Sequence, residues 1–165
     1  MKSLLTRKSI RKYTSQAVSD ETVKELLHAA MSAPSAANQR PWHFVVIKDR
    51  EVLDAIPKFH PYAGPLKGAP LAIAVCATSE LGAFKDYWVQ DCAAATQNIL
   101  SAVVEKGLGA VWLGVYPKQN VQEIHKLLQL PENITPFSLI SIGYPDEQKE
   151  AGNRYDEERV HYNKW

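Results

Sequence analysis

The sequence has few cysteines, no long hydrophobic run and no excess of one charge sign. Its 165 residues include two cysteines, and 19 Lys and Arg against 18 Asp and Glu leave a net charge of +1. This composition excludes a disulfide scaffold and argues against a nucleic-acid-binding domain, which is usually basic. The longest apolar run, Leu71 to Ala77, is far below the ~20 residues that cross a membrane. Residues 1–13 are basic but have no apolar segment behind them, so they do not form a secretory signal. We expect a single cytoplasmic domain spanning residues 1–165, with no nucleic-acid or membrane partner.

Several common catalytic signatures are also missing. Gly107-Leu-Gly109 is followed by Trp112 where a dinucleotide-binding fingerprint needs glycine, and Val115 follows Gly114 where a P-loop needs lysine. The five histidines and two cysteines show no metal-ligand spacing, and no G-x-S-x-G motif is present. The sequence therefore predicts neither a metal site nor a serine hydrolase.

Hydrophobic periodicity predicts alternating helices and strands. Apolar residues recur at three- and four-residue steps over 23–31, in a helix that Ser19 can cap and that Ala33-Pro34 ends. They recur again over 86–106, so both segments are expected to be helices with a buried face. Apolar runs at 44–47, 71–76, 110–115 and 137–142 predict strands. The run at 71–76 is apolar on both faces, which is typical of a central strand. The pattern favours an α+β fold in which helices cover a mixed sheet.

The strongest charge feature is a basic N-terminal segment. Arg7, Lys8 and Arg11 precede the first acidic residue, Asp20. In an extended backbone alternate side chains share a face, so Arg7, Ser9 and Arg11 would lie together. Two guanidinium groups and a hydroxyl suit a phosphate. A solvated basic terminus is the alternative.

Two further segments have features that suit a flat ligand. Residues 34–42 combine small side chains, which let a ring approach the backbone, with the donors and acceptors of Asn38 and Gln39. Gly114 interrupts an apolar strand, where a glycine often marks a bulge or the close approach of a ligand. An ordinary capped loop and a packing glycine are the alternatives.

The C-terminal segment 147–165 has few aliphatic residues but retains Tyr155, Tyr162 and Trp165. Disordered tails are usually poor in aromatic residues. The segment is therefore expected to be an extended arm that lies on a surface, either of its own domain or of a second subunit.

Taken in order, these segments resemble the FMN-dependent nitroreductase family over nearly the whole chain. The matching motifs are Arg7-Lys-Ser-Ile-Arg11-Lys-Tyr, Ala33-Pro-Ser-Ala-Ala-Asn38-Gln39-Arg-Pro41-Trp42, Gly107-Leu-Gly-Ala-Val-Trp-Leu-Gly114 and Arg159. The resemblance implies an α+β fold with a mixed central sheet wrapped by helices. It also implies a homodimer in which each C-terminal arm embraces the partner and FMN lies at the subunit interface.

The resemblance assigns the phosphate end of FMN by position. It implies that the phosphate and ribityl contacts come from Arg7, Lys8, Ser9 and Arg11, and that Arg159 joins the phosphate from the arm.

The resemblance assigns the ring end to two other segments. Leu113 and Gly114 correspond to the strand end whose backbone N–H faces flavin N5, with Leu113 where many relatives carry Glu. A contact from Gln90 or Asp91 to the flavin is left open. The stretch that the partner subunit lays against the isoalloxazine ring corresponds to Pro34, Ser35, Ala36 and Asn38.

The implied activity is that of an NAD(P)H:acceptor oxidoreductase with ping-pong kinetics. Hydride from NADPH or NADH would pass through flavin N5 to an electron-poor acceptor such as a nitroaromatic or a quinone. The flavin performs the chemistry, so no catalytic side chain is expected. The same fold supports other flavin chemistry, such as reductive dehalogenation or flavin fragmentation. A non-enzymatic flavin-binding protein is a further alternative.

Overall fold

The computed structural model describes residues 2–78, 84–117 and 120–165. Its helices are α1 (Lys2–Thr6), α2 (Asp20–Met31), α3 (Arg50–Ala55), α4 (Trp88–Glu105) and α5 (Asn120–Leu127). Its strands are β1 (Trp42–Ile47), β2 (Leu71–Thr78), β3 (Gly109–Gly114) and β4 (Ile134–Gly143). Short 3₁₀ turns lie at 36–38, 56–58, 64–67, 85–87 and 157–159.

The four strands form one sheet in the order β1-β2-β4-β3, and every neighbouring pair is antiparallel. β2 is an inner strand and is buried from Leu71 to Ala77, as its two apolar faces predict. A parallel component comes from the N-terminal segment, where Ser9 bridges Ala110 of β3. The predicted α+β fold is confirmed.

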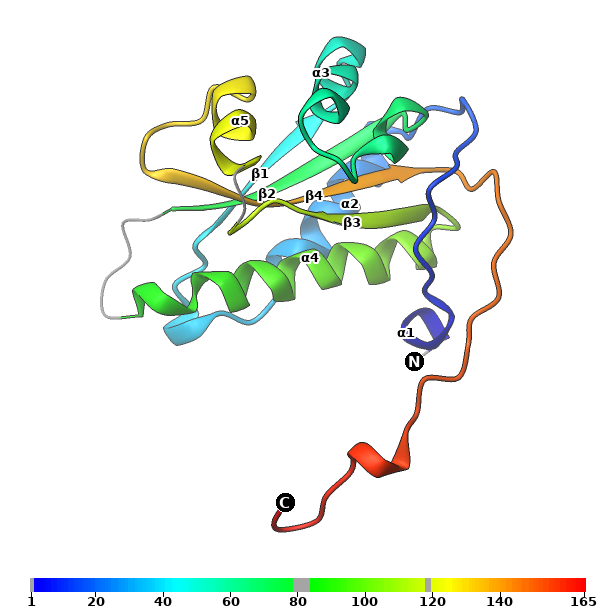
Figure 1. Ribbon diagram of the computed structural model, residues 1–165, viewed down its shortest axis with the longest axis vertical. Coiled ribbons are helices and arrows are strands. Elements are labelled where there is room, and N and C mark those ends of the chain that lie inside the picture. Colours follow the sequence, from blue (N-terminus) through cyan, green and yellow to red (C-terminus); the bar gives the residue numbers. More distant parts are fainter. Residues whose placement is uncertain (1, 79–83, 118–119) are drawn as a thin grey trace.

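Helices cover both faces of the sheet (Figure 1). Because side chains alternate along a strand, Ile73 of β2 packs with α2 and α4, while Ala74 packs with α3 and α5. Helix α2 begins as its sequence predicts, since the Ser19 hydroxyl accepts the N–H of Thr22 at 3.2 Å. Apolar side chains thus pack between the sheet and the helices on each of its two faces.

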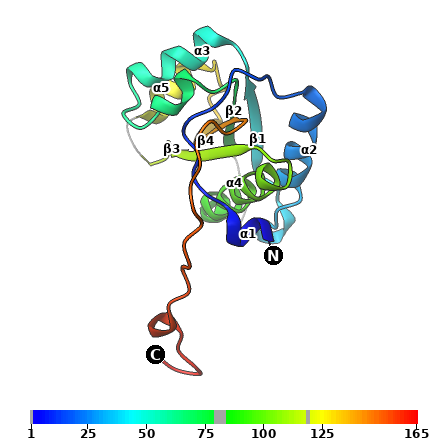
Figure 2. The same cartoon turned by 90° about the vertical axis from the view of Figure 1, so that its right-hand side faces the viewer.

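Both ends of the chain lie outside these layers. The N-terminal segment runs along β3, while residues after β4 leave the sheet and extend away from the domain (Figures 1 and 2). Residues 150–165 are exposed throughout, and Tyr162 is 83% exposed. In a single chain the arm therefore does not pack on its own domain. None of the described helices is long and apolar enough to span a bilayer.

Candidate functional site

The basic N-terminal segment presents two different faces. Thr6, Lys8 and Ile10 line a hollow that also includes Leu108. Since side chains alternate in an extended segment, Arg7, Ser9 and Arg11 belong to the opposite face. The grouping of these three residues stays a prediction, and Lys8 lies on the other face, in the hollow. The ammonium group of Lys8 instead donates to the carbonyl of Lys149.

The root of the C-terminal arm fastens this segment to the domain. Glu147 accepts the N–H groups of Arg11 at 2.5 Å and Lys12 at 3.3 Å. Lys149 donates to the carbonyl of Ser9 and to Glu147, both at 2.9 Å. The N–H of Arg11, followed by the ammonium of Lys149, holds the pKa of Glu147 below its usual range. The backbone that carries the predicted phosphate ligands is therefore fixed by residues from 136 to 140 positions away.

Tyr13, the last residue of the first motif, forms hydrogen bonds within the fold. Its hydroxyl donates to the carbonyl of Ile10 at 2.6 Å and accepts from the Ser141 hydroxyl at 2.9 Å. Burial raises the pKa of Tyr13 to about 12. This side chain therefore ties the basic segment to β4 rather than contacting a ligand.

Gly114 ends β3 at the open edge of the sheet. The N–H of Val115 donates to the carbonyl of Phe137 in β4 at 3.2 Å. Main-chain groups of an antiparallel strand alternate in direction, so both the N–H and the C=O of Gly114 point away from β4. The main-chain groups of Ala110 point in the same direction, because its carbonyl accepts the N–H of Ile10 at 2.9 Å on this outer side.

The two glycines of β3 differ in the space that a side chain would have. A Cβ at Gly109 would lie 2.7 Å from the Cβ of Ile10, so packing against the N-terminal segment requires glycine there. A Cβ at Gly114 would meet no atom within 4 Å. Packing within one chain therefore explains Gly109 but not Gly114.

The loop between α2 and β1 is held by Asp91, in the first turn of α4. Asp91 is buried, with 5% of the residue exposed. It accepts the N–H of Ala36 at 2.9 Å through one oxygen and the side-chain amide of Gln39 at 3.0 Å through the other. The Ser35 hydroxyl accepts the N–H of Arg40 at 2.9 Å. Asp91 thus shapes the loop with both oxygens, whereas Gln90 beside it is exposed.

The same loop has a strained backbone. Ala37, Asn38 and Arg40 have φ values of 48°, 56° and 48°. Left-handed conformations are uncommon for residues other than glycine, and strain of this kind persists where the surrounding structure enforces it, often at functional sites. The loop therefore contains three residues in a conformation that its surroundings must hold in place. Pro34 and Asn38 are exposed at its surface.

A single chain does not bring the loop and the basic segment together. The loop contacts α4 at Asp91, whereas the hollow beside Lys8 includes Val104 of the same helix. At a rise of 1.5 Å per residue these points are about 20 Å apart along α4. Arg159 lies in the exposed arm, where it pairs with Asp156 at 2.7 Å. Its predicted phosphate contact also cannot form within one chain in this conformation.

His60 and Asp91 are two buried polar residues whose partners sequence reasoning did not predict. His60 is 1% exposed, and its Nε2 lies 2.9 Å from the carbonyl oxygen of Gly114. Asp91 carries a weak signal, since an acidic residue interrupts an apolar helix. His60 carries none, because its partner is 54 positions away.

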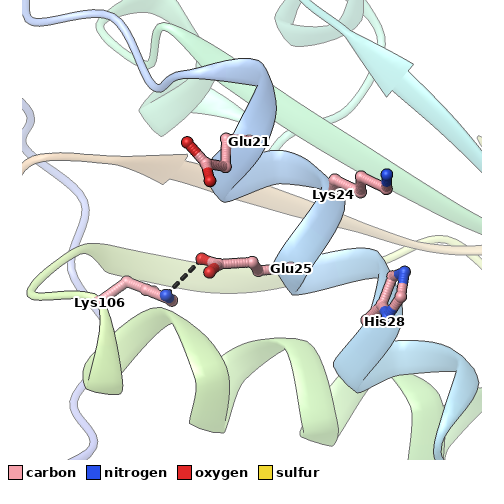
Figure 3. A pocket seen from close by; sticks show the side chains of 5 residues that line it. All are labelled: Glu21, Lys24, Glu25, His28 and Lys106. Atoms are coloured by element: carbon pink, nitrogen blue, oxygen red, sulfur yellow. Dashed lines mark ion pairs between the residues drawn. The ribbon is translucent and has the colours of Figure 1, made fainter.

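Other features of the surface and core are separate from these residues. A hollow between α2 and the end of α4 is lined by charged side chains of both signs, and Glu25 pairs with Lys106 beside it (Figure 3). Burial raises the pKa of both Cys76 and Cys92 to about 12, and both are free thiols. Within the described ranges, no group of His, Cys, Asp or Glu side chains is arranged to hold a metal ion.

Comparison with known proteins gives a consistent result. The profile of the nitroreductase family matches residues 4–63 and 60–144. A protein of Methanothermobacter thermautotrophicus, provisionally named an NADH dehydrogenase/NAD(P)H nitroreductase, is 47% identical over all of this chain and 87% of its own length. The solved structure of an FMN-dependent nitroreductase from Clostridium difficile has a TM-score of 0.91 and 34% identity, and the match covers the whole of both chains.

These matches place the molecule among α+β oxidoreductases. The chain belongs to the nitroreductase family. A more distant relative is the iodotyrosine deiodinase of Haliscomenobacter hydrossis, which is 28% identical over 86% of this chain and 77% of its own length.

Proposed function

We propose that the chain is an FMN-dependent NAD(P)H:acceptor oxidoreductase that acts as a homodimer in the cytoplasm. Family membership and the FMN-dependent relative support the predicted enzyme class and cofactor. The observation that carries the proposal is the open edge of β3. It has a main-chain donor with no packing role at Gly114 and a basic face beside Ala110.

The residues at this edge fit the two ends of FMN. Ala110 and Gly114 are four residues apart, which corresponds to about 13 Å along a strand. FMN is elongated, with a phosphate at one end and a flat ring at the other. Arg7, Ser9 and Arg11 would hold the phosphate, since charge-assisted hydrogen bonds to phosphate are strong and arginine is suited to them. The backbone at Gly114 would lie against the ring.

The bound cofactor would accept hydride from a nicotinamide and pass it to an electron-poor acceptor. The chain's own part is to bind and orient. The Gly114 N–H would donate to an acceptor atom of the ring, and the absence of a side chain would let the ring reach it. Leu113 is buried among the side chains facing α3 and α5, so it places no acidic group at the edge. No catalytic side chain is required.

The homodimer is supported by apolar surface that one chain leaves uncovered. Leu4 and Leu5 of α1 are 55% and 67% exposed, and Tyr155 and Trp165 are exposed in the arm. Large exposed apolar side chains can mark a protein–protein interface when a partner covers them. A partner would also supply what one chain cannot bring to its own β3 edge, namely the loop residues Pro34, Ser35, Ala36 and Asn38 and the arm residue Arg159.

The test is the absorbance spectrum of the purified protein. We expect the bands of bound FMN and their loss when NADPH or NADH is added without oxygen. A nitroaromatic or a quinone should then restore the bands. Protein that binds no flavin when FMN is supplied would contradict the proposal. Flavin that binds but resists both nicotinamides would indicate a non-enzymatic flavin-binding protein.

Reductive dehalogenation is a second candidate because the deiodinase relative covers most of the chain. It can be tested on the same reduced protein. Release of iodide from an iodinated phenol, at a rate above that of nitroaromatic reduction, would favour this activity over the first.

A further inference from the structure

His60 is the buried member of five histidines, all of which lie in the described ranges. It follows α3 in a loop with its own backbone bonds. Its N–H donates to the carbonyl of Ile56 at 3.0 Å, and its carbonyl accepts the N–H of Ala63 at 3.0 Å. These bonds fix the backbone on both sides of the side chain. The imidazole is therefore held in place rather than free to turn towards solvent.

The partners of the ring define the role of each nitrogen. Nε2 lies 2.9 Å from the carbonyl oxygen of Gly114, which can only accept, so Nε2 donates. Nδ1 lies 3.3 Å from the N–H of Tyr62, which can only donate, so Nδ1 accepts. Both ring nitrogens are thus used for main-chain hydrogen bonds.

This arrangement changes what the end of β3 offers to a ligand. The N–H and the C=O of Gly114 both point to the open side of the strand. His60 fills one of the two acceptor positions of the carbonyl oxygen, so this oxygen is a weaker acceptor for a ligand, while the N–H stays available as a donor. A molecule that approaches the strand end therefore meets a donor whose neighbouring acceptor is already bonded.

We propose that His60 is a positioning residue that caps the Gly114 carbonyl, so that the strand end favours the oxidised ring of FMN over the reduced ring. The proposal rests on the proposed function. N5 of oxidised flavin is a hydrogen-bond acceptor and matches the free N–H. N5 of reduced flavin carries a hydrogen and would instead match a free carbonyl. Capping the carbonyl therefore lowers the reduction potential of the bound cofactor and makes it a stronger reductant.

Two substitutions separate the bonds of the two ring nitrogens. The amide nitrogen of glutamine reaches about as far from the backbone as Nε2, so His60→Gln keeps the bond to Gly114. Asparagine reaches only about as far as Nδ1, so His60→Asn keeps an acceptor for Tyr62 and uncaps the carbonyl. The matched control is His125→Asn, because His125 also bonds a carbonyl, that of Pro131 at 3.0 Å, and lies in α5.

The measurements are the Kd for oxidised FMN, from fluorescence quenching, and the midpoint potential of bound FMN, from equilibration with reference dyes. His60→Asn should weaken binding of oxidised FMN relative to reduced FMN by about threefold to tenfold, the range expected for one hydrogen bond. For a two-electron couple this raises the potential by ~15–30 mV. His60→Gln and His125→Asn should match the unsubstituted protein. If His60→Asn does not fold, His60→Ala should show the raised potential, and added imidazole should restore it.

The contrary results are specific. If His60→Asn has an unchanged potential, or if the potential of His60→Gln is shifted as far as that of His60→Asn, the proposal is wrong. A loss of thermal stability without a shift in potential would show that His60 only fastens its loop to β3. Failure of the unsubstituted protein to bind FMN would instead overturn the proposed function.

Discussion

Gly114→Val is expected to separate stability from reactivity. The side chain would enter space where a Cβ meets no atom within 4 Å, so no steric clash within the chain is expected. Valine also suits a strand better than glycine, whose flexibility costs about 0.5–1 kcal/mol in such a position. At about 2–4 °C per kcal/mol for a chain of this size, Tm should stay constant or rise by up to about 4 °C.

The reaction should respond in the opposite direction. Two methyl groups at the strand end would hold the flavin ring away from the Gly114 N–H, while the phosphate ligands remain untouched. A displacement of about 1 Å from a productive geometry can slow a reaction about a hundredfold. The variant should therefore be yellow, and NADPH should bleach it about a hundred times more slowly than the unsubstituted protein in an anaerobic stopped-flow experiment.

Gly109→Ala is the matched control in the same strand. Its new Cβ would lie 2.7 Å from Ile10, and overpacking of this kind typically costs about 1–3 kcal/mol. We expect a lower Tm and weaker FMN retention, because Ile10 belongs to the basic segment. Rapid reduction of a folded, yellow Gly114→Val protein would refute the placement of Gly114 beside the flavin ring.

Three further changes test the rest of the site. Arg7→Ala should weaken FMN binding roughly tenfold or more, since a charged hydrogen bond contributes about 1.5–3 kcal/mol; full FMN occupancy after dialysis would contradict the phosphate assignment. A chain that ends at Lys149 keeps the bonds to the basic segment but loses the exposed arm, so sedimentation should show a monomer or aggregate where the full chain is a dimer; a monomeric full chain that binds FMN would overturn the dimer. Ala37→Gly should raise the free energy of unfolding by about 1 kcal/mol, because glycine adopts the φ of 48° without strain; an unchanged or lower value in thermal melts would show that the loop strain is not stored at this residue.

Much of the site follows from short-range patterns. The predicted grouping of Arg7, Ser9 and Arg11 depends only on the alternation of an extended segment, because the direction of a side chain depends on local backbone geometry. The same rule, applied to Lys8, separates it from this group, and the structure places it beside Lys149. The family resemblance assigned Lys8 by its position in a motif, which does not say which way its side chain points.

The sequence by itself determined helices α2 and α4, the four strands and the order of the motifs, since these depend on periodicity and on residues close in the chain. Helix α1 was not predicted from the sequence. The tertiary structure decided the rest. It separated Gly109, which packs on Ile10, from Gly114, which meets nothing, although both glycines look alike in the sequence. It also placed the Asp91 carboxylate within hydrogen-bond distance of the Ala36 N–H, and the His60 imidazole within hydrogen-bond distance of the Gly114 carbonyl. These bonds join residues 55 and 54 positions apart, and such pairs are set by how the sheet and helices pack, which local sequence patterns do not encode.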